Sequence, residues 1–554
     1  MNAALLLEHY ARIADAPDAI ARLRRFVLDL AVRGKLVEQD AGDEPASELL
    51  KRIAAEKARL VRAGEARKPK AISDLAGPPY TLPDNWRWSQ IAEIGIINPR
   101  VDADDNALAS FVPMPLISAE YGVPNGHEPR PWGQIKKGYT HFAEGDVGLA
   151  KITPCFENGK STVFANLTGG MGSGTTELHV VRPLFVDPAY ILVFWKCPFF
   201  IENGIPRMTG TAGQKRVPTD YFANSPFPLP PLAEQHRIVA KVDELMALCD
   251  QLEAARVSRE AARDTFTLST LAKLNTPDPE TFAPDARFAL ANLAPLTTRP
   301  DQIKQLRQTI LNLAVRGKLV EQDAGDEPAS VLLGRLGVEA IPERVDDANL
   351  KLPNGWKWVQ VDDCFIVSGG MQKTPARAPK QNAFPYLGVG NVYRGRLDLV
   401  NVKEFELVAG ELERFRLECG DILVVEGNGS ASEIGRCAVW GGEIENCVHQ
   451  NHIIRCRPKD MTLTPYAVLY LNSPDGMNEM TRLAITSAGL FSLSVGKIRK
   501  IPIPLPPLAE QHRIVAKVDE LMALCDQLEA SLTTGEQTRS RLLEAVLHHT
   551  LEPA

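Results

Sequence analysis

The chain contains two long internal repeats, and they constrain its fold more than any other feature. The 27 residues 228–254, PLPPLAEQHRIVAKVDELMALCDQLEA, recur unchanged at 504–530. The 18 residues 30–47, LAVRGKLVEQDAGDEPAS, recur at 313–330. Repeats of this length indicate a structural unit that is used twice. Because the segments between the repeats are unlike, the chain carries two different modules on two nearly identical scaffold halves.

The order of these repeats predicts an α+β protein with a pseudo-twofold internal repeat. Two globular mixed α/β modules should be joined by two long antiparallel helical regions that form a coiled coil. The N-terminal and C-terminal repeats can then pair in space as the central ones do. The expected bounds are 1–79 (N-terminal helical region), 80–227 (first module), 228–349 (central helical spacer), 350–503 (second module) and 504–554 (C-terminal helical region).

The longer repeat predicts a long helix. Two prolines, Pro230 and Pro231, end any preceding strand. Apolar residues then alternate at spacings of four and three, the heptad pattern of a coiled coil. The pattern reaches about Leu274 and stops at Asn275, which gives a rod of about 60 Å. Ordinary core helices are the alternative. The seam consists of Ile238, Val242, Leu245, Cys249 and Leu252 in the first copy and Ile514, Val518, Leu521, Cys525 and Leu528 in the second.

The shorter repeat leads into two arms of different length. From Pro45 to Leu82 is 37 residues, whereas from Pro328 to Leu352 is 24. The second arm also contains Gly334, and glycine is unfavourable inside a helix. Its helix should therefore be the shorter one. Within the modules, short β-rich runs between turns predict strands at 176–182, 422–426 and 451–456.

The composition is that of a globular protein, with 44% hydrophobic and 24% charged residues. No apolar stretch is long enough to span a membrane, and the N-terminus lacks the basic start of a secretory signal. The nine Cys include no CxxC pair, which favours a reduced, cytoplasmic compartment. The formal net charge is −7, so any contact with nucleic acid must come from particular loops.

Polar loops in both modules offer groups suited to DNA. Residues 142–160, FAEGDVGLAKITPCFENGK, place a turn and a short strand before such a loop. Ammonium groups suit phosphates, while amides and hydroxyls suit base edges. A solvated turn is the plainer interpretation of each loop. The candidate contacts are Lys151, Thr153, Asn158, Lys160, Gln214, Lys215 and Arg216 in the first module, and Lys373, Arg377, Asn428, Gln450, Asn451 and Ser492 in the second.

A group of Cys and His residues in the second module raises the question of a metal site. Cys437, Cys447 and Cys456 lie close in sequence to His449 and His452. Their spacings match no standard zinc motif, so we expect no metal. The run from His449 to His452 is interpreted instead as a polar strand edge that could meet DNA.

Enzyme motifs are incomplete in this chain. Gly159-Lys160-Ser161 resembles the end of a phosphate-binding loop, but Pro154 occupies the place of the required first glycine. Asn224-Ser225-Pro226-Phe227 has the wrong second residue for the tetrapeptide of amino-methyltransferases. We therefore expect no catalytic residue. Two alternatives stay open: an enzyme with its own transferase or nucleotide site, and a coiled-coil scaffold that binds only protein.

These residues resemble the specificity subunit of type I restriction-modification enzymes. The resemblance rests on the two repeats, on GDVGLAKITPCFENGK and on TGTAGQKRVPTDYF, and it covers essentially the whole chain. It implies two target recognition domains, each of which reads one half of a split, asymmetric DNA site. The helical regions between them serve as a spacer and a docking surface. The second module lacks the segment KITPCFENGK and has the sequence LVVEGNGS instead.

The same resemblance implies the partners of this chain. They are double-stranded DNA, two modification subunits that methylate adenine and, in a restricting complex, two motor-nuclease subunits. S-adenosylmethionine belongs to the modification subunits, and ATP with Mg²⁺ belongs to the restriction subunit. The chain itself is expected to be non-catalytic, to bind no cofactor and no metal, and to work in the cytoplasm without a membrane, in defence against phage.

Overall fold

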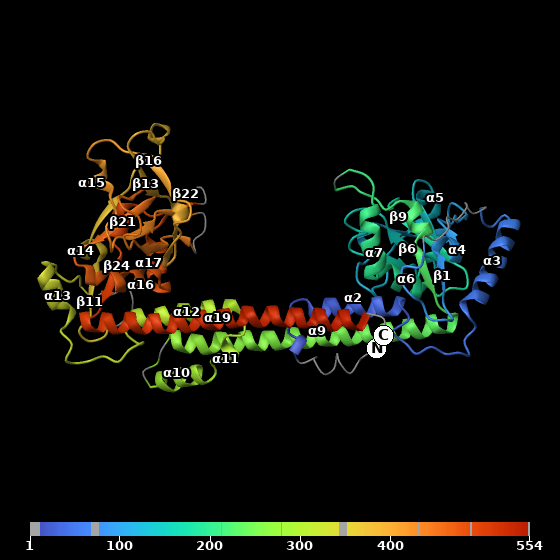
Figure 1. Cartoon of the computed structure of the whole chain (residues 1–554), viewed down its shortest axis with the longest axis horizontal. Coiled ribbons are helices and arrows are strands. Elements are labelled where there is room, and N and C mark those ends of the chain that lie inside the picture. Colours follow the sequence, from blue (N-terminus) through green and yellow to red (C-terminus); the bar gives the residue numbers. More distant parts are fainter. Residues whose placement is uncertain are drawn as a thin grey trace. The chain divides into compact units, whose positions relative to one another are not determined.

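The chain folds into two compact units in a computed structural model (Figure 1). Unit 1 comprises residues 1–259 and 535–554, and unit 2 comprises residues 260–534. The structure describes residues 12–67, 77–211, 213–276, 278, 280–342, 352–428, 433–487 and 490–551. Each unit combines helices with several small sheets, as expected for an α+β protein. The five-part division of the sequence stays a prediction.

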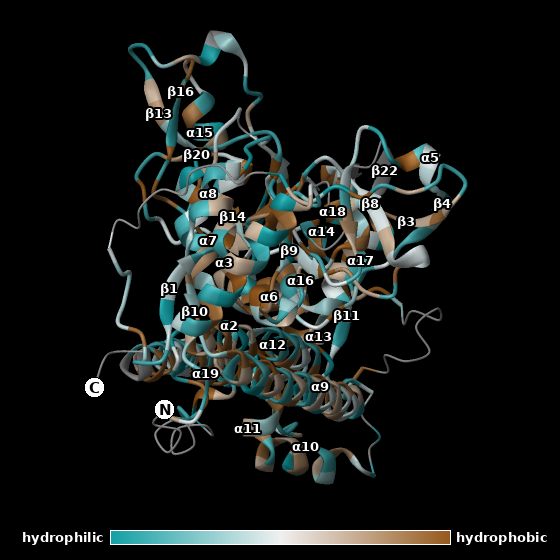
Figure 2. Ribbon diagram, turned by 90° about the vertical axis from the view of Figure 1, so that its right-hand side faces the viewer, coloured by the Kyte–Doolittle hydropathy of each residue, from teal (hydrophilic) through white to brown (hydrophobic). Residues whose placement is uncertain are grey.

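Two helices of 44 residues each contribute to both units. Helix α9 spans Leu232–Asn275 and helix α19 spans Leu508–Leu551. Each begins directly after a pair of prolines, and α9 ends at Asn275, so the helix predicted from the longer repeat and its end are confirmed. Both helices carry a mixture of hydrophilic and hydrophobic residues, seen as teal and brown in Figure 2. At 1.5 Å per residue, each is about 66 Å long.

Most of the seam residues are buried in the cores of the units. In unit 1, Ile238 and Val242 pack in one cluster with Leu543 and Leu547 of α19. Helix α2, Ala19–Val32, contributes Phe26 to this core. In unit 2, Ile514, Val518 and Cys525 pack with residues of α12, Pro300–Val315. The C-terminal part of α9 also packs there, through Leu271 and Leu274 beside Leu313. The two units thus place corresponding helical segments in corresponding cores.

The arms that follow the shorter repeat differ in length as predicted. Helix α3, Ala46–Arg62, has 17 residues, whereas helix α13, Ala329–Leu336, has 8. Between α9 and α12 the chain forms two further short helices, α10 (Phe282–Ala291) and α11 (Leu293–Leu296). Among the described residues, no helix is both long and apolar enough to cross a membrane.

The first module is built on two four-stranded sheets. One has the order β2-β9-β6-β7 and the other β4-β3-β8-β5, while β1 pairs with β10. Helices α6 (Pro188–Lys196), α7 (Pro198–Gly204) and α8 (Thr219–Asn224) pack in one core with β6 of the first of these sheets. The strands are β1 Arg87–Gln90, β2 Gly95–Ile97, β3 Leu108–Val112, β4 Glu128–Pro131, β5 Thr140–Ala143, β6 Val147–Ala150, β7 Ser161–Val163, β8 Met171–Gly174, β9 Leu178–Pro183 and β10 Pro226–Leu229.

The second module repeats the inner sheet, has three strands in the outer sheet instead of four, and adds a further small sheet. The sheet β12-β21-β17-β19 is four-stranded, whereas β16-β13-β20 and β18-β23-β22 have three strands each. Helices α16 (Thr464–Asn472) and α17 (Pro474–Leu483) pack nearby. The strands are β11 Lys357–Gln360, β12 Phe365–Gly369, β13 Ala383–Leu387, β14 Val392–Tyr393, β15 Arg396–Leu397, β16 Lys403–Glu406, β17 Ile422–Val425, β18 Gly427–Asn428, β19 Cys437–Val439, β20 Val448–His449, β21 Ile453–Pro458, β22 Ile485–Ser487, β23 Leu490–Ser492 and β24 Pro502–Leu505.

A hydrogen-bonded Trp–Glu pair attaches each module to its long helix. In unit 1 the Trp86 indole N–H donates to Glu234 of α9 at 2.9 Å, and Gln39 donates to the other oxygen of the same carboxylate. In unit 2, Trp356 donates to Glu510 of α19, also at 2.9 Å, with Gln322 in the role of Gln39. Gln39, Glu234 and their counterparts belong to the repeated sequences, and Trp86 and Trp356 share the local pattern Leu-Pro-x-x-Trp-x-Trp, so the attachment is the same in both units.

A buried Asp–Arg pair holds the inner sheet of each module. Gly145 and Gly420 make the turns before β6 and β17 at φ of 81° and 89°, a conformation that glycine adopts without strain. The next residue, Asp146 or Asp421, accepts two hydrogen bonds from Arg182 of β9 or Arg457 of β21, at 2.8–2.9 Å. Both carboxylates are almost fully buried. The inner skeleton is therefore shared although the sequences differ.

Candidate nucleic-acid interface

In the first module the structure brings the two predicted DNA loops together. The Val217 N–H donates to the Lys151 carbonyl at 2.8 Å, and the Thr153 N–H donates to the Lys215 carbonyl at 2.9 Å. These bonds align the loop after β6 with the loop that precedes α8. Candidates that are some sixty residues apart in the chain therefore form one polar rim. Whether this rim contacts DNA stays a prediction.

The side chains of this rim are engaged to different degrees. Arg216 donates two hydrogen bonds to Glu177, at 2.9 and 2.8 Å, and this pairing lowers the pKa of the Glu177 carboxyl. Lys160 donates to the Met114 carbonyl at 3.3 Å, and Thr153 donates to Glu157 at 3.2 Å. The exposed candidates are Asn158, Gln214 and Lys215. Because Arg216 is already neutralised by a carboxylate, the exposed side chains are better placed for a ligand.

Lys151 is half-buried at the centre of this rim. Burial lowers the pKa of its ammonium, Glu177 opposes that shift, and the nearby Arg216 adds to it. Burial has this effect because it disfavours the charged form of a lysine. The sequence singled out Lys151 by its loop, but its half-buried state follows from packing.

In the second module, Asn428 and Ser492 lie in one small sheet. Strand β18 pairs with β23 so that Gly427 faces Ser492 and Asn428 faces Phe491. Ser492 is half-buried, whereas the Asn428 side chain lies outside the described residues. The loop after β17 therefore meets the segment before α18, Val495–Arg499. The corresponding segments meet in the first module, so the juxtaposition is kept while the residues change.

Gln450 and Asn451 lie at the end of β20, beside the start of the segment that carries Lys373. The Asn451 N–H donates to the Met371 carbonyl at 2.7 Å, and both predicted side chains are half-exposed. The prediction of a polar strand edge is wrong for His449, which is fully buried and meets the Ile453 carbonyl through Nδ1 at 3.0 Å. Burial lowers the pKa of His449 to about 4, so the ring is neutral at pH 7.

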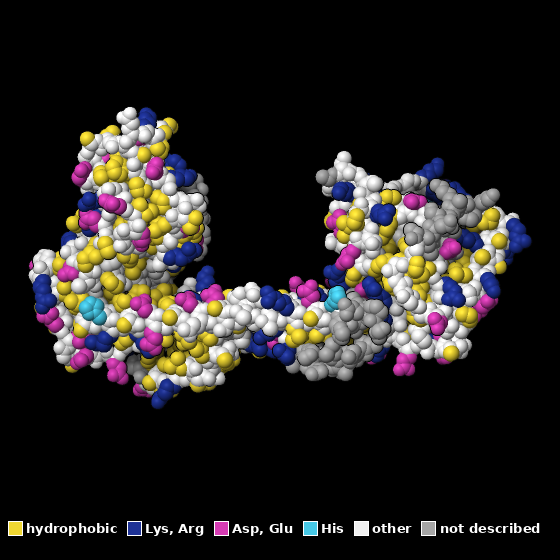
Figure 3. Space-filling view, viewed as in Figure 1, with side chains coloured by type: hydrophobic (Ala, Val, Ile, Leu, Met, Phe, Trp, Pro, Cys, Tyr) yellow, Lys and Arg dark blue, Asp and Glu magenta, His cyan; other side chains and the backbone are white. Residues whose placement is uncertain are grey.

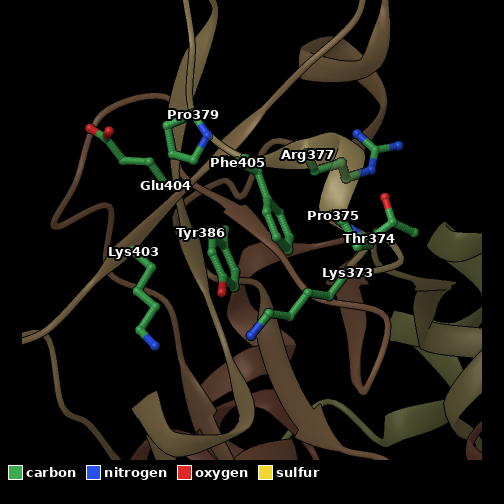
Figure 4. Close-up of a pocket in the computed structure, with 10 residues that line it drawn as sticks. Lys373, Thr374, Pro375, Arg377, Pro379, Tyr386, Lys403, Glu404 and Phe405 are labelled. Atoms are coloured by element: carbon green, nitrogen blue, oxygen red, sulfur yellow. The ribbon is translucent and has the colours of Figure 1, made fainter.

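An open hollow of about 500 Å³ lies beside β13 and β16 (Figure 4). The Tyr386 and Phe405 rings stack next to it at a centroid distance of 3.6 Å. In Figure 4 the Lys373 amine points towards the Tyr386 hydroxyl, and Lys403 lies on the other side of that ring. Within the part of the chain that the structure describes, the ammonium group of neither lysine forms a hydrogen bond or ion pair. Two unneutralised cations therefore border one hollow.

Arg377, which also lines this hollow, is neutralised. Its guanidinium donates two hydrogen bonds to Glu411 at 2.8 Å and lowers the pKa of that carboxyl to about 2. Lys373 was a candidate contact from the sequence, and the structure adds Lys403 and Tyr386 beside it; a role of any of them in DNA binding stays a prediction. Lys403 and Tyr386 belong to strands with no sequence counterpart in the first module, so the repeat gave no signal for them. On the face seen in Figure 3, basic side chains of unit 2 gather along the edge where Figure 1 places β22.

The Cys residues of the second module are core residues. Cys437, Cys447 and Cys456 are buried, and burial raises the pKa of the Cys437 and Cys447 thiols to about 12. Their thiols are therefore protonated at pH 7, whereas zinc binds thiolates. Over the described ranges, no three His, Cys, Asp or Glu side chains gather where they could hold a metal ion.

Comparison with known proteins defines the class and then the family. Residues 353–534 match the model of the "Type I restriction modification DNA specificity domain". The chain is 38% identical over 564 residues to the type I restriction enzyme EcoEI specificity subunit of Escherichia coli, covering 95% of this chain and 93% of that protein. It is 36% identical to the EcoAI specificity subunit of the same species, with the same coverage. The chain belongs to the family of type I restriction enzyme specificity subunits.

A solved structure supports the fold. One chain of the structure described as "Structural basis underlying complex assembly and conformational transition of the type I R-M system" superposes with a TM-score of 0.50 at 20% identity. The match covers 85% of this chain and 99% of that chain.

Proposed function

We propose that this specificity subunit recognises a split, asymmetric DNA site, with one half-site for each module. The observation that carries the proposal is the pairing of a shared inner skeleton with different rim residues in the two modules. A shared skeleton presents its rim in the same way, while different side chains select different bases. Phosphate contacts by lysines such as Lys215 would supply affinity, and base-edge contacts would supply sequence choice.

The two long helices would fix the gap between the half-sites. Helix α9 begins in unit 1 and ends in unit 2, and α19 runs in the reverse order along the chain. This order supports an antiparallel coiled coil with a pseudo-twofold axis, joined through the seam residues. Seven residues inserted after Leu252 and seven after Leu528 should lengthen the gap by about 10 Å, or about three base pairs. An unchanged gap would show that the helices do not set the spacing.

The chain would act without chemistry of its own. Its partners would be two modification subunits, which bring S-adenosylmethionine, and in a restricting complex two motor-nuclease subunits, which use ATP and Mg²⁺. The target adenine must leave the base stack for methylation, at a cost of a few kcal/mol, and a partner's pocket would receive it. Such a complex works where the DNA is, in the bacterial cytoplasm.

The decisive experiment is single-molecule sequencing of N6-methyladenine in DNA from cells that express this chain with its modification subunit. We expect a split asymmetric motif that disappears when this chain is deleted. No motif, despite a stable complex, would favour a scaffold that binds only protein. S-adenosylmethionine binding by the isolated chain would favour an enzyme with its own transferase site.

A further inference from the structure

One backbone position on the rim of each module carries side chains of opposite charge. Lys151 follows strand β6, and its N–H donates to the Glu177 carbonyl at 2.9 Å. Glu426 follows strand β17, and its N–H donates to the His452 carbonyl at 2.9 Å. The offsets are the same, because 426 − 151 and 452 − 177 are both 275.

The carbonyls of the two residues pair in a matching way as well. The Lys151 carbonyl accepts from Val217 at 2.8 Å, and the Glu426 carbonyl accepts from Leu493 at 2.7 Å. These partners differ by 276 positions, the offset of the longer repeat. Lys151 and Glu426 are therefore structural equivalents, five residues after the matching Asp146 and Asp421, although the loops that follow them differ in sequence.

The neighbouring residue also differs between the modules, Glu177 in the first and His452 in the second. Beside Lys151 stands Glu177, whose two carboxylate oxygens are both taken by Arg216. No hydrogen bond within the described residues uses the Lys151 ammonium. Lys151 thus holds unused donors in a half-buried position.

Glu426 holds unused acceptor capacity instead. Its Oε2 meets His452 Nδ1 at 3.1 Å, and its side chain is 28% exposed. Its other carboxylate oxygen has no hydrogen bond to any residue that the structure describes. A carboxylate repels phosphate, so this shared position cannot serve as a backbone contact in both modules. Base edges, which present donors or acceptors according to sequence, suit both residues.

We propose that Lys151 and Glu426 are matching specificity-determining residues. Each reads one base of a G·C pair in its own half-site. Lys151 donates to the acceptor edge of a guanine in one half-site, and Glu426 accepts from the amino group of a cytosine in the other. These are the pairings that lysine and glutamate geometry favours in the major groove. The inference rests on the proposed function, because it requires that each rim faces DNA.

The test is selection from a random DNA pool by the purified complex of the full chain with its modification subunits. The variants are K151Q, K151E, E426Q and E426K. The charge-matched controls are K137E and E445K, which alter exposed residues of the same modules. We expect K151E to exchange guanine for cytosine at one position of one half-site, and E426K to do the reverse in the other. K151Q and E426Q should each relax that position by roughly tenfold, while the controls keep the wild-type motif.

Three results would separate the possible failures. If the wild-type complex selects no motif, the proposed function itself is wrong. If the wild type selects a split motif that all four variants retain, the rim position does not read bases. If K151E loses a whole half-site while K151Q keeps the wild-type motif, Lys151 only supports the loop, and the inference is overturned.

Discussion

The two modules differ most at their outer sheets and least where they meet the long helices. Each carries a Trp–Glu attachment, a buried Asp–Arg pair and a tyrosine hydroxyl bonded to a proline carbonyl, through Tyr190 in unit 1 and Tyr466 in unit 2. Outside this skeleton, the first module has a four-stranded sheet and the second has two three-stranded ones. The comparison teaches that a repeated skeleton attaches each module to its long helix, while the outer part of each module varies.

Exchange of a whole module should give the largest effect. Replacement of residues 81–225 with the corresponding segment of another family member should replace one half-site completely and leave the other half-site and the gap unchanged. The reason is that Glu234 and Gln39 stay in place and can accept and support the tryptophan that the new segment carries at the position of Trp86. Sequencing of N6-methyladenine measures the outcome. Simultaneous loss of both half-sites would contradict the hypothesis that each module reads its own half-site.

Loss of the buried carboxylate should destabilise both modules alike. Asp146→Ala and Asp421→Ala each leave an arginine without its main partner and free a turn N–H that the carboxylate had accepted. We expect about 3 kcal/mol lower free energy of unfolding in the affected unit. Denaturation followed by hydrogen exchange in each unit measures it.

The control for this prediction is the double variant D421A/R457M. It removes both charges, so it should be less destabilised than the sum of the single variants. A loss in only one of the two modules would show that their skeletons are not energetically equivalent.

Acid should weaken both modules through different histidines. Burial lowers the pKa of His179 and of His449 to about 4, below the usual value near 6.5. Each therefore contributes stability that is present above pH 6.5 and is lost as pH falls towards 4. At pH 5 the loss should be about 2 kcal/mol for each histidine. His179→Gln should flatten the pH dependence in unit 1 alone, as read by hydrogen exchange. An equally steep profile in that variant would assign the acid effect to other groups.

Removal of the indole N–H should have a smaller, matched effect. Trp86→Phe and Trp356→Phe each delete one hydrogen bond to a buried glutamate, at a cost of about 1–2 kcal/mol. Equal losses in the two units, measured by denaturation, would sharpen the comparison. A loss of stability in only one unit would mean that the two repeated attachments contribute differently to the free energy of unfolding.

The hollow beside β16 gives the smallest expected effect, and it concerns the second module alone. If Lys373 and Lys403 contact phosphates, the variant K373A/K403A should reduce the slope of log affinity against log salt by about two. Its half-site sequence should not change, because phosphate contacts carry no base information. Arg377→Ala serves as the control, since its guanidinium is already paired with Glu411. An unchanged slope for the double variant would remove the hollow from the interface.

Local sequence signals predicted much of the fold. The strands at 176–182, 422–426 and 451–456 correspond to β9, β17 and β21 within a few residues, since each is a short β-rich run between turns. The polar edge at His449 was misjudged because its own neighbours in sequence do not reveal that β20 pairs with β13 or that Gly370 lies against the imidazole ring.

By itself, the sequence determined the duplication, the two long helices with the end of α9 at Asn275, and the unequal arms. These features can be predicted from local signals, namely sequence identity, heptad spacing and the positions of proline and glycine. Only the tertiary structure decided which polar side chains remain available. Arg216 and Arg377 look like equal candidates to Lys151 and Lys373, yet folding pairs both arginines with carboxylates. The matching Gly-Asp turns at 145–146 and 420–421 already indicate the equivalence of Lys151 and Glu426, but only the backbone hydrogen bonds between segments far apart in the chain establish it.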